Sequence, residues 1–159
     1  MVFTYYFFNL YRKDRAFVLS LFWWFILALT RSELREKCMI ILYQNDIINK
    51  NRNDGNIDEI IKENLEIDND FVKEIVYGVI THLNELDSIA NKYMNDWTID
   101  RIDKTGAAIL RIGLYELKYT DTPSLVVINE AIELAKKYSD ENIRKMINAV
   151  LDKVINEEE

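Results

Sequence analysis

The chain has 159 residues, of which 49% are hydrophobic and 30% are charged, and its formal net charge is -7 at pH 7. This length is typical of one domain, and a chain this acidic is not expected to coat nucleic acid through bulk charge. Four glycines and one proline give few turn signals, so the composition favours a helical bundle over a strand-rich fold. The single cysteine, Cys38, excludes an internal disulfide and is predicted to be a buried thiol.

Residues 1–29 differ in composition from the rest of the chain. Arg12, Lys13 and Arg15 precede the apolar run 16–29, which is the pattern of a secretory signal or a membrane anchor. The run is shorter than the roughly 20 residues needed to cross a membrane, and no typical cleavage site follows it. We therefore expect a leader that reflects a start site upstream of the natural one, with a membrane anchor as the alternative, followed by one helical domain over residues 30–159.

Helical periodicity continues from Thr30 to the end of the chain. The expected elements are a helix from residue 30, a polar loop over 49–56, helices over 57–63 and 71–93, a helical turn near 99–102, and helices over 104–119, from 122–123 to 139, and from 139 onward. Asp68 or Asp70 is expected to cap the helix over 71–93, and Ser139 the last one. The helix over 104–119 is apolar on nearly all sides, which predicts a central, buried position. The sequence therefore predicts an all-α compact bundle of about six or seven helices.

Residues that could carry catalysis or bind a metal are few and isolated. His82 is the only histidine and lies on an expected helix face, where Asp87 is too far around the helix to share its environment. Glu130 and Glu133 lie one turn apart and are expected to be surface charges, and Ser124 has no histidine near it to activate it. We therefore predict no enzyme activity and no metal site.

The first expected helix combines cationic, aromatic and amide side chains. Arg31 and Arg35 lie one turn apart and could contact adjacent phosphates. Tyr43 could stack on an unpaired base, and Gln44 could read a base edge. This combination is suited to single-stranded RNA, although Tyr43 could equally cover the core.

Several motifs occur in an order that resembles the NusB family of bacterial transcription antitermination factors. They are R-x-x-x-R-E-K-x-x-x-x-L-Y-Q at 31–44, V-Y-G-V at 76–79, A-I-L-R-I-G-L-Y-E-L at 108–117, I-N-E-A-I-E-L-A-K-K-Y at 128–138 and N-A-V-L-D-K at 148–153. Each motif is weak alone, whereas their order and spacing are specific, and together they cover residues 31–159.

The resemblance implies an all-α protein that pairs with the NusE-type ribosomal protein of the small subunit and binds the boxA element of nascent RNA. The pair would join the elongating RNA polymerase and support ribosomal RNA transcription in the cytoplasm, without catalysis or a cofactor. A homodimer is also compatible with the resemblance. The resemblance implies RNA contacts at Arg31, Arg35, Lys37, Tyr43, Asn142 and Lys145. Gln44 is added to them from the residue pattern of the first helix. Met146 falls where the family often has a phenylalanine that meets the ribosomal partner.

The sequence departs from the family pattern at four positions. Ser32 interrupts the usual run of arginines, and Gly106 with Ala107 replaces an acidic–basic pair. Gly106 is expected to weaken its helix, and Ala149 stands where glycine is common and is expected to tighten the packing of the last helix. Two alternatives stay open: a NusB-like module of an RNA methyltransferase system, and a helical interaction module tethered to a membrane by the leader.

Overall fold

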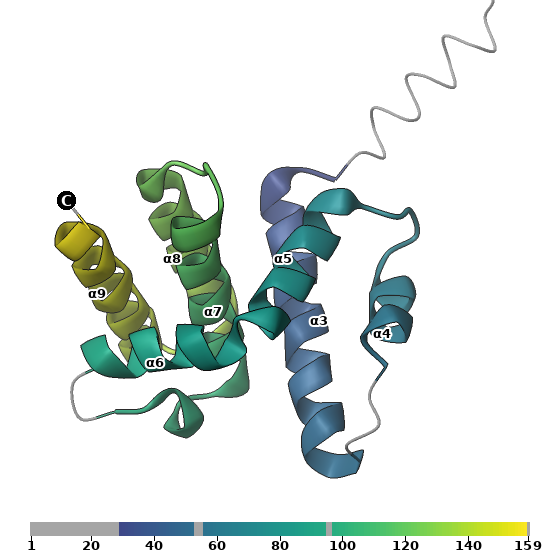
Figure 1. The fold of residues 1–159 in the computed structure, drawn as a ribbon, viewed down its shortest axis with the longest axis horizontal. Helices are drawn as coiled ribbons and strands as arrows, with labels where there is room; N and C mark the ends of the chain where they lie inside the picture. Colours follow the sequence, from purple (N-terminus) through teal and green to yellow (C-terminus); the bar gives the residue numbers. More distant parts are fainter. Residues whose placement is uncertain (1–28, 53–55, 95–96, 159) are drawn as a thin grey trace, which may run out of the picture. The chain divides into compact units, whose positions relative to one another are not determined.

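The computed structural model describes residues 29–52, 56–94 and 97–158 (Figure 1). Within these residues the chain forms seven α-helices, one 3₁₀-helix and no strand, which confirms the predicted all-α class. The elements are α3 (Arg31–Arg52), α4 (Ile57–Asn64), α5 (Asp70–Thr81), α6 (Leu83–Tyr93), η1 (Ile99–Arg101), α7 (Lys104–Tyr119), α8 (Ser124–Tyr138) and α9 (Glu141–Glu158). The predicted leader lies outside the described residues, apart from Leu29. No helix within the described ranges is both long and apolar enough to span a membrane.

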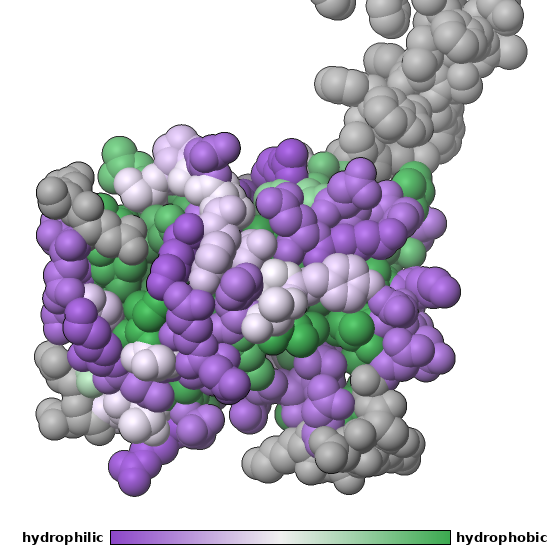
Figure 2. Space-filling model, in the orientation of Figure 1, coloured by the Kyte–Doolittle hydropathy of each residue, from purple (hydrophilic) through white to green (hydrophobic). Residues whose placement is uncertain are grey.

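Helix α7 forms the centre of the bundle over Arg31–Glu159, as its all-round apolar sequence predicts. It packs against α3, α5, α6, α8 and α9, and residues 106–116 are all buried. In Figure 1 helices α7, α8 and α9 lie side by side, while α3 packs against α4 and α5. Hydrophilic side chains cover most of the face shown in Figure 2, and apolar side chains show in patches among them. Cys38 is fully buried, as predicted.

The prediction of one helix over 71–93 is wrong, because the helix is interrupted at His82. The backbone of His82 has φ −102° and ψ 16°, which ends α5 and begins α6. The apolar periodicity continues across this point, so the sequence pattern carries no signal of the bend. Its physical reason is packing, since α5 lies against α3 and α7, whereas α6 lies against α7 and α9. The ring of His82 stacks on Tyr119 of α7 at 4.2 Å, and Tyr119 stacks on Tyr115.

Three local predictions of helix ends also need correction. Helix α3 continues through Arg52, so the polar segment expected as a loop over 49–56 is helical in its first half. The side chain of Asn69, rather than Asp68 or Asp70, caps α5 by accepting from the N–H of Val72. Asp140 caps α9 through the N–H groups of Asn142 and Ile143. The hydroxyl of Ser139 instead donates to the carboxylate of Asp103.

Two buried arginines connect the central helix to its neighbours. Arg35 of α3 donates two hydrogen bonds to Glu116 of α7, with nitrogen–oxygen distances of 2.8 and 2.7 Å. Arg111 of α7 donates two to Asp87 of α6 and lies 3.4 Å from a carboxylate oxygen of Asp46 in α3. Burial alone would lower the pKa of each arginine, but the hydrogen bonds and charges of these carboxylates outweigh it and raise the pKa. Both arginines therefore stay charged and fix α3 on α7.

Candidate nucleic-acid interface

Arg35 does not lie on the surface where the sequence analysis placed it. The residue is 4% exposed, and its guanidinium is held by the buried carboxylate of Glu116. A second carboxylate, that of Glu130, lies 3.6 Å from Nη1 of Arg35. Glu130 also accepts a hydrogen bond of 2.8 Å from the hydroxyl of Ser32. Glu130 was expected to be a free surface charge, and it instead joins α8 to α3, whereas Glu133 is exposed as expected.

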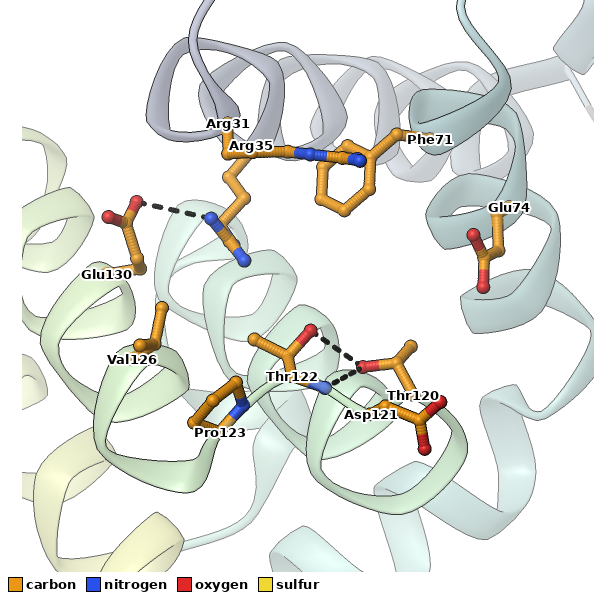
Figure 3. A pocket seen from close by; sticks show the side chains of 10 residues that line it. All are labelled: Arg31, Arg35, Phe71, Glu74, Thr120, Asp121, Thr122, Pro123, Val126 and Glu130. Atoms are coloured by element: carbon orange, nitrogen blue, oxygen red, sulfur yellow. Dashed lines mark hydrogen bonds and ion pairs between the residues drawn. The ribbon is translucent and has the colours of Figure 1, made fainter.

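Arg31 lies at the exposed N-terminal end of α3, beside a pocket of about 470 Å³. Its guanidinium carbon lies 4.2 Å from the centre of the Phe71 ring, a distance typical of a cation–π contact. Figure 3 shows the side chains arranged around a central hollow, with the two arginines on one side and Asp121 and Glu74 on others. Arg31 and Arg35 are therefore brought together, as predicted, but in a pocket that also contains several carboxylates.

The other predicted α3 residues are divided between two flanks of the helix. Lys37 and Tyr43 are six residues apart, which places them about 120° apart around an α-helix. Gln44 is half-buried, and its carbonyl oxygen accepts a hydrogen bond of 2.7 Å from Asn64 of α4. The structure therefore places Gln44 on the side of α3 that faces α4, with Lys37 close to it in rotation and Tyr43 on another flank.

The flank of α3 that carries Tyr43 meets the end of α8. Tyr43 is 40% exposed and lies seven residues after Glu36, so the two share one side of the helix. Glu36 accepts hydrogen bonds from Nζ of Lys137, at 2.8 and 2.9 Å, and from the hydroxyl of Tyr138. These hydrogen bonds, with the positive charge of Lys137, lower the pKa of Glu36 below its ordinary value. We call Tyr43, Glu36, Lys137 and Tyr138 the tyrosine–lysine flank.

The remaining predicted residues lie on the helix that follows this flank. Helix α9 begins three residues after Tyr138, and Asn142 and Lys145 are both exposed near its start. Nζ of Lys145 lies 3.8 Å from a carboxylate oxygen of Glu141, an exposed pairing that leaves the lysine accessible. Met146 is half-buried and packs against the core, so only part of its side chain is available to a partner.

Sequence reasoning missed Lys137, Tyr138 and Lys104 as members of this region. Nζ of Lys104 lies 3.1 Å from a carboxylate oxygen of Asp46, three residues beyond Tyr43 on α3. The sequence contains K-K-Y at 136–138, which is a recognisable cationic–aromatic signal. Its proximity to α3 could not be read from the sequence, because Glu36 and Lys137 are separated by 101 positions.

The departures from the family pattern at Ser32 and Gly106 have structural explanations, whereas the prediction for Ala149 is wrong. The Ser32 hydroxyl bonds Glu130, so this position contributes to the contact between α3 and α8. Gly106 lies in the first turn of α7, where a Cβ atom would stand 2.5 Å from Cγ2 of Ile143, and its N–H bonds the carboxylate of Asp103. Its small size thus permits the close approach of α9. Ala149 is exposed, so it does not tighten the packing of α9 as expected.

The fold is an all-α bundle in which an exposed surface of α3 is joined to the end of α8 through Glu36, Lys137 and Tyr138. Residues 32–156 match the model of the NusB family, which covers most of the chain. The chain therefore belongs to the NusB family. This result confirms the resemblance that its ordered motifs indicate.

Individual relatives support the same assignment. The chain is 40% identical over 129 residues to the transcription antitermination protein NusB of Campylobacter jejuni strain 81-176, covering 79% of this chain and 96% of that protein. It is 38% identical over 130 residues to the NusB of Listeria innocua, covering 80% and 98%. Among solved structures, NusB of T. maritima superposes with a TM-score of 0.70 at 30% identity, covering 82% of this chain and 94% of that one.

A further solved structure contains a complex. It holds the antitermination factors NusB and NusE with double-stranded RNA, and its similar chain has a TM-score of 0.68 and 30% identity. The alignment covers 80% of this chain and 96% of the other.

Proposed function

We propose that this protein is a transcription antitermination factor. In this proposal it binds boxA-type RNA together with a NusE-type ribosomal protein of the small subunit, and the complex joins the elongating RNA polymerase to support ribosomal RNA transcription. The family membership and the names of the relatives support the antitermination role. The structure of NusB and NusE with RNA supports both partners. We also propose that the protein acts in the cytoplasm, where nascent transcripts are made, and that it binds rather than catalyses, without a cofactor.

The observation that carries the RNA-binding proposal is the tyrosine–lysine flank. Tyr43 and Tyr138 are 40% and 37% exposed, and aromatic rings of this kind can stack on unpaired bases. Lys137 adds a cation next to Tyr138, with Nζ 5.0 Å from the centre of that ring. Asn142 and Lys145 follow at the start of α9 and extend the polar, cationic surface. Base stacking with only a few cations is a mode of RNA binding available to an acidic protein.

Acidic side chains hold the cations of this surface in the free protein. Glu36 binds Lys137, and Asp46 binds Lys104. A phosphate that approaches either lysine must compete with the carboxylate already bound there, which lowers the gain from each contact. We therefore propose that the protein alone binds RNA weakly and that the ribosomal partner supplies the missing contacts. Met146 on α9 is the residue that we propose for contact with that partner.

The predicted α3 contacts have different roles in this proposal. Arg31 is exposed and can reach a phosphate beyond the end of α3. Lys37 is half-buried on another flank of α3 and would contact only RNA that wraps around the helix. Arg35 and Gln44 act indirectly, because Glu116 and Asn64 already bind them. We propose that Arg35 orients α3 on the bundle and so positions Tyr43.

The experiment that tests the RNA surface uses matched pairs of variants. Fluorescence anisotropy would follow a labelled boxA-like RNA, single-stranded or duplex, titrated with the full chain in the presence of the ribosomal protein. Tyr43→Ala should weaken single-stranded binding about tenfold, because loss of one base–aromatic stack costs roughly 1–3 kcal/mol. Lys137→Gln should weaken it and flatten its dependence on salt, by about one unit in the log–log slope.

Two neighbouring residues supply the controls. Tyr77→Ala removes a tyrosine of similar exposure from α5. Lys136→Gln removes the lysine before Lys137; Lys136 pairs with Glu133 and not with Glu36. Neither control should change RNA binding by more than about twofold. Equal effects in test and control variants would show that another face binds RNA. A preference for the duplex would contradict the stacking role of Tyr43.

The two alternative functions predict different outcomes in binding and fractionation experiments. A module of an RNA methyltransferase system would need a catalytic partner chain and would show no dependence on the ribosomal protein. A membrane-tethered module depends on the leader over residues 1–29, which lies outside the described residues apart from Leu29, and would appear in the membrane fraction.

A further inference from the structure

The pocket at the N-terminal end of α3 has a charge balance that does not suit RNA. It is formed by the ends of α3 and α5 and by the segment that joins α7 to α8, on residues that include Arg31, Phe71, Glu74, Asp121, Val126 and Glu130. The charge of Arg35, which also lines it, is matched by the bidentate carboxylate of Glu116. Arg31 is then the remaining cation of the lining, against the three carboxylates of Glu74, Asp121 and Glu130.

Two of those carboxylates are available to a ligand. Glu74 and Asp121 are exposed, and neither side chain forms an ion pair or hydrogen bond with another residue in the described ranges. In Figure 3 the two side chains flank one side of the hollow, opposite Glu130. Helix α8 begins at Ser124 beside the pocket, and its first N–H groups favour an anion. That effect amounts to about half a unit charge, so the carboxylates outweigh it.

Apolar side chains continue the pocket onto the surface. Pro123 and Val126 form part of its lining, and Val126 is 41% exposed. The adjacent Leu125 is 74% exposed, the largest fraction among the exposed apolar side chains of the described residues. An occupant would therefore combine a positive charge with an aliphatic contact. A protein segment with an arginine next to a leucine has both properties, and the planar guanidinium can bind two carboxylates at once.

We propose that this pocket docks an arginine side chain of a partner protein, with the guanidinium between Glu74 and Asp121 and a neighbouring aliphatic residue on Val126 and Leu125. The surface lies at the N-terminal end of α3, whereas the tyrosine–lysine flank meets the C-terminal end of α8. The inference goes beyond the proposed RNA binding. It assigns a second, protein-binding surface to the bundle.

NMR titration of the ¹⁵N-labelled full chain tests the proposal with defined probes. The first probe is acetyl-Arg-Leu-amide, and the second is acetyl-citrulline-Leu-amide, which has nearly the same shape but no charge. The arginine probe should shift the amide signals of residues 120–126 and bind about fivefold tighter than the citrulline probe, because charge-assisted hydrogen bonds are stronger than neutral ones. Inorganic phosphate and a short single-stranded RNA should leave these signals in place.

A double variant, Glu74→Gln with Asp121→Asn, should abolish the difference between the two probes. The matched control is Glu63→Gln with Asp100→Asn, which neutralises two exposed acids elsewhere and should retain it. Both double variants should change RNA binding to the same small extent. Equal affinity of the two probes for the wild-type chain would overturn the proposal, as would a difference that survives in the Glu74/Asp121 variant. Specific shifts of residues 120–126 by phosphate or RNA would assign the pocket to nucleic acid instead.

Discussion

At the scale of single residues, the buried ion pair of Arg35 with Glu116 joins α3 to α7. Two arginines at i and i+4 were expected to form a phosphate-binding pair on the surface. The spacing is correct, and both side chains do lie near Phe71. The burial of Arg35 depends on Glu116, which is 81 positions away in the sequence and is the only acidic residue of the largely apolar helix α7. A single carboxylate in an apolar helix was the available signal that a buried cation must be near.

Removal of the Glu116 charge tests this pairing. Glu116→Gln should lower the free energy of unfolding by about 3–5 kcal/mol, because it leaves the Arg35 charge buried and poorly compensated. The measurement is urea denaturation followed by circular dichroism at neutral pH. The control is Glu141→Gln, which removes an exposed partner of Arg144 and should cost no more than about 1 kcal/mol. A similar loss of unfolding free energy in the two variants would contradict a buried ion pair between Arg35 and Glu116.

At the scale of helices, the elements themselves were largely predictable. The helix over 104–119 was predicted with both ends correct, because its apolar residues surround the helix and Thr120 to Pro123 break the pattern. The bend at His82 was not predictable, because the apolar residues of α5 and α6 recur at the same helical spacing before and after it. Gly78 marks a different feature, since a Cβ atom there would stand 2.0 Å from Cζ of Tyr115 in α7. The close approach of α5 to α7 thus requires glycine.

Substitution of Gly78 tests how closely the two helices approach. Gly78→Ala should destabilise the fold by about 1–3 kcal/mol, because the added methyl group overlaps the Tyr115 ring. The double variant with Tyr115→Leu should recover most of the loss, since the shorter side chain vacates that space. Gly113→Ala is the control, because its nearest neighbours are the side-chain ends of Leu151 at 3.1 Å. Thermal unfolding of the three variants measures this, and a Gly78→Ala protein as stable as the wild type would refute the contact.

The contact between α3 and α8 should depend on pH through Glu36. Hydrogen bonds from Lys137 and Tyr138 lower the pKa of Glu36 from its ordinary value of 4.5. A lowered carboxylate pKa stabilises the fold above that ordinary value, and the stabilisation is lost as the pH falls through the lowered one. Glu36→Gln should therefore reduce stability at about pH 7 and reduce it by less at about pH 3. Denaturation curves at the two pH values check this. A deficit of the same size at both would exclude the ionised carboxylate as its cause.

At the scale of the whole molecule, the net charge of -7 argues against RNA binding through bulk charge and favours binding at one local surface. The candidate surface fits that condition, since it combines exposed tyrosines with lysines that acidic neighbours partly neutralise. The sequence predicted Tyr43, Asn142 and Lys145 for it, but not the contribution of α8, because helices distant in sequence form one surface only in the fold. We therefore expect such a surface to need a partner to bind RNA tightly.

The most direct test of the account measures that dependence. A labelled single-stranded boxA-like RNA would be titrated with the full chain in dilute buffer, with and without a saturating amount of the NusE-type ribosomal protein. We expect weak binding by the chain alone and at least about tenfold tighter binding with the partner, because coupling between two binding sites commonly changes affinity by about this factor. The same affinity in both titrations, or no binding by the pair, would contradict it.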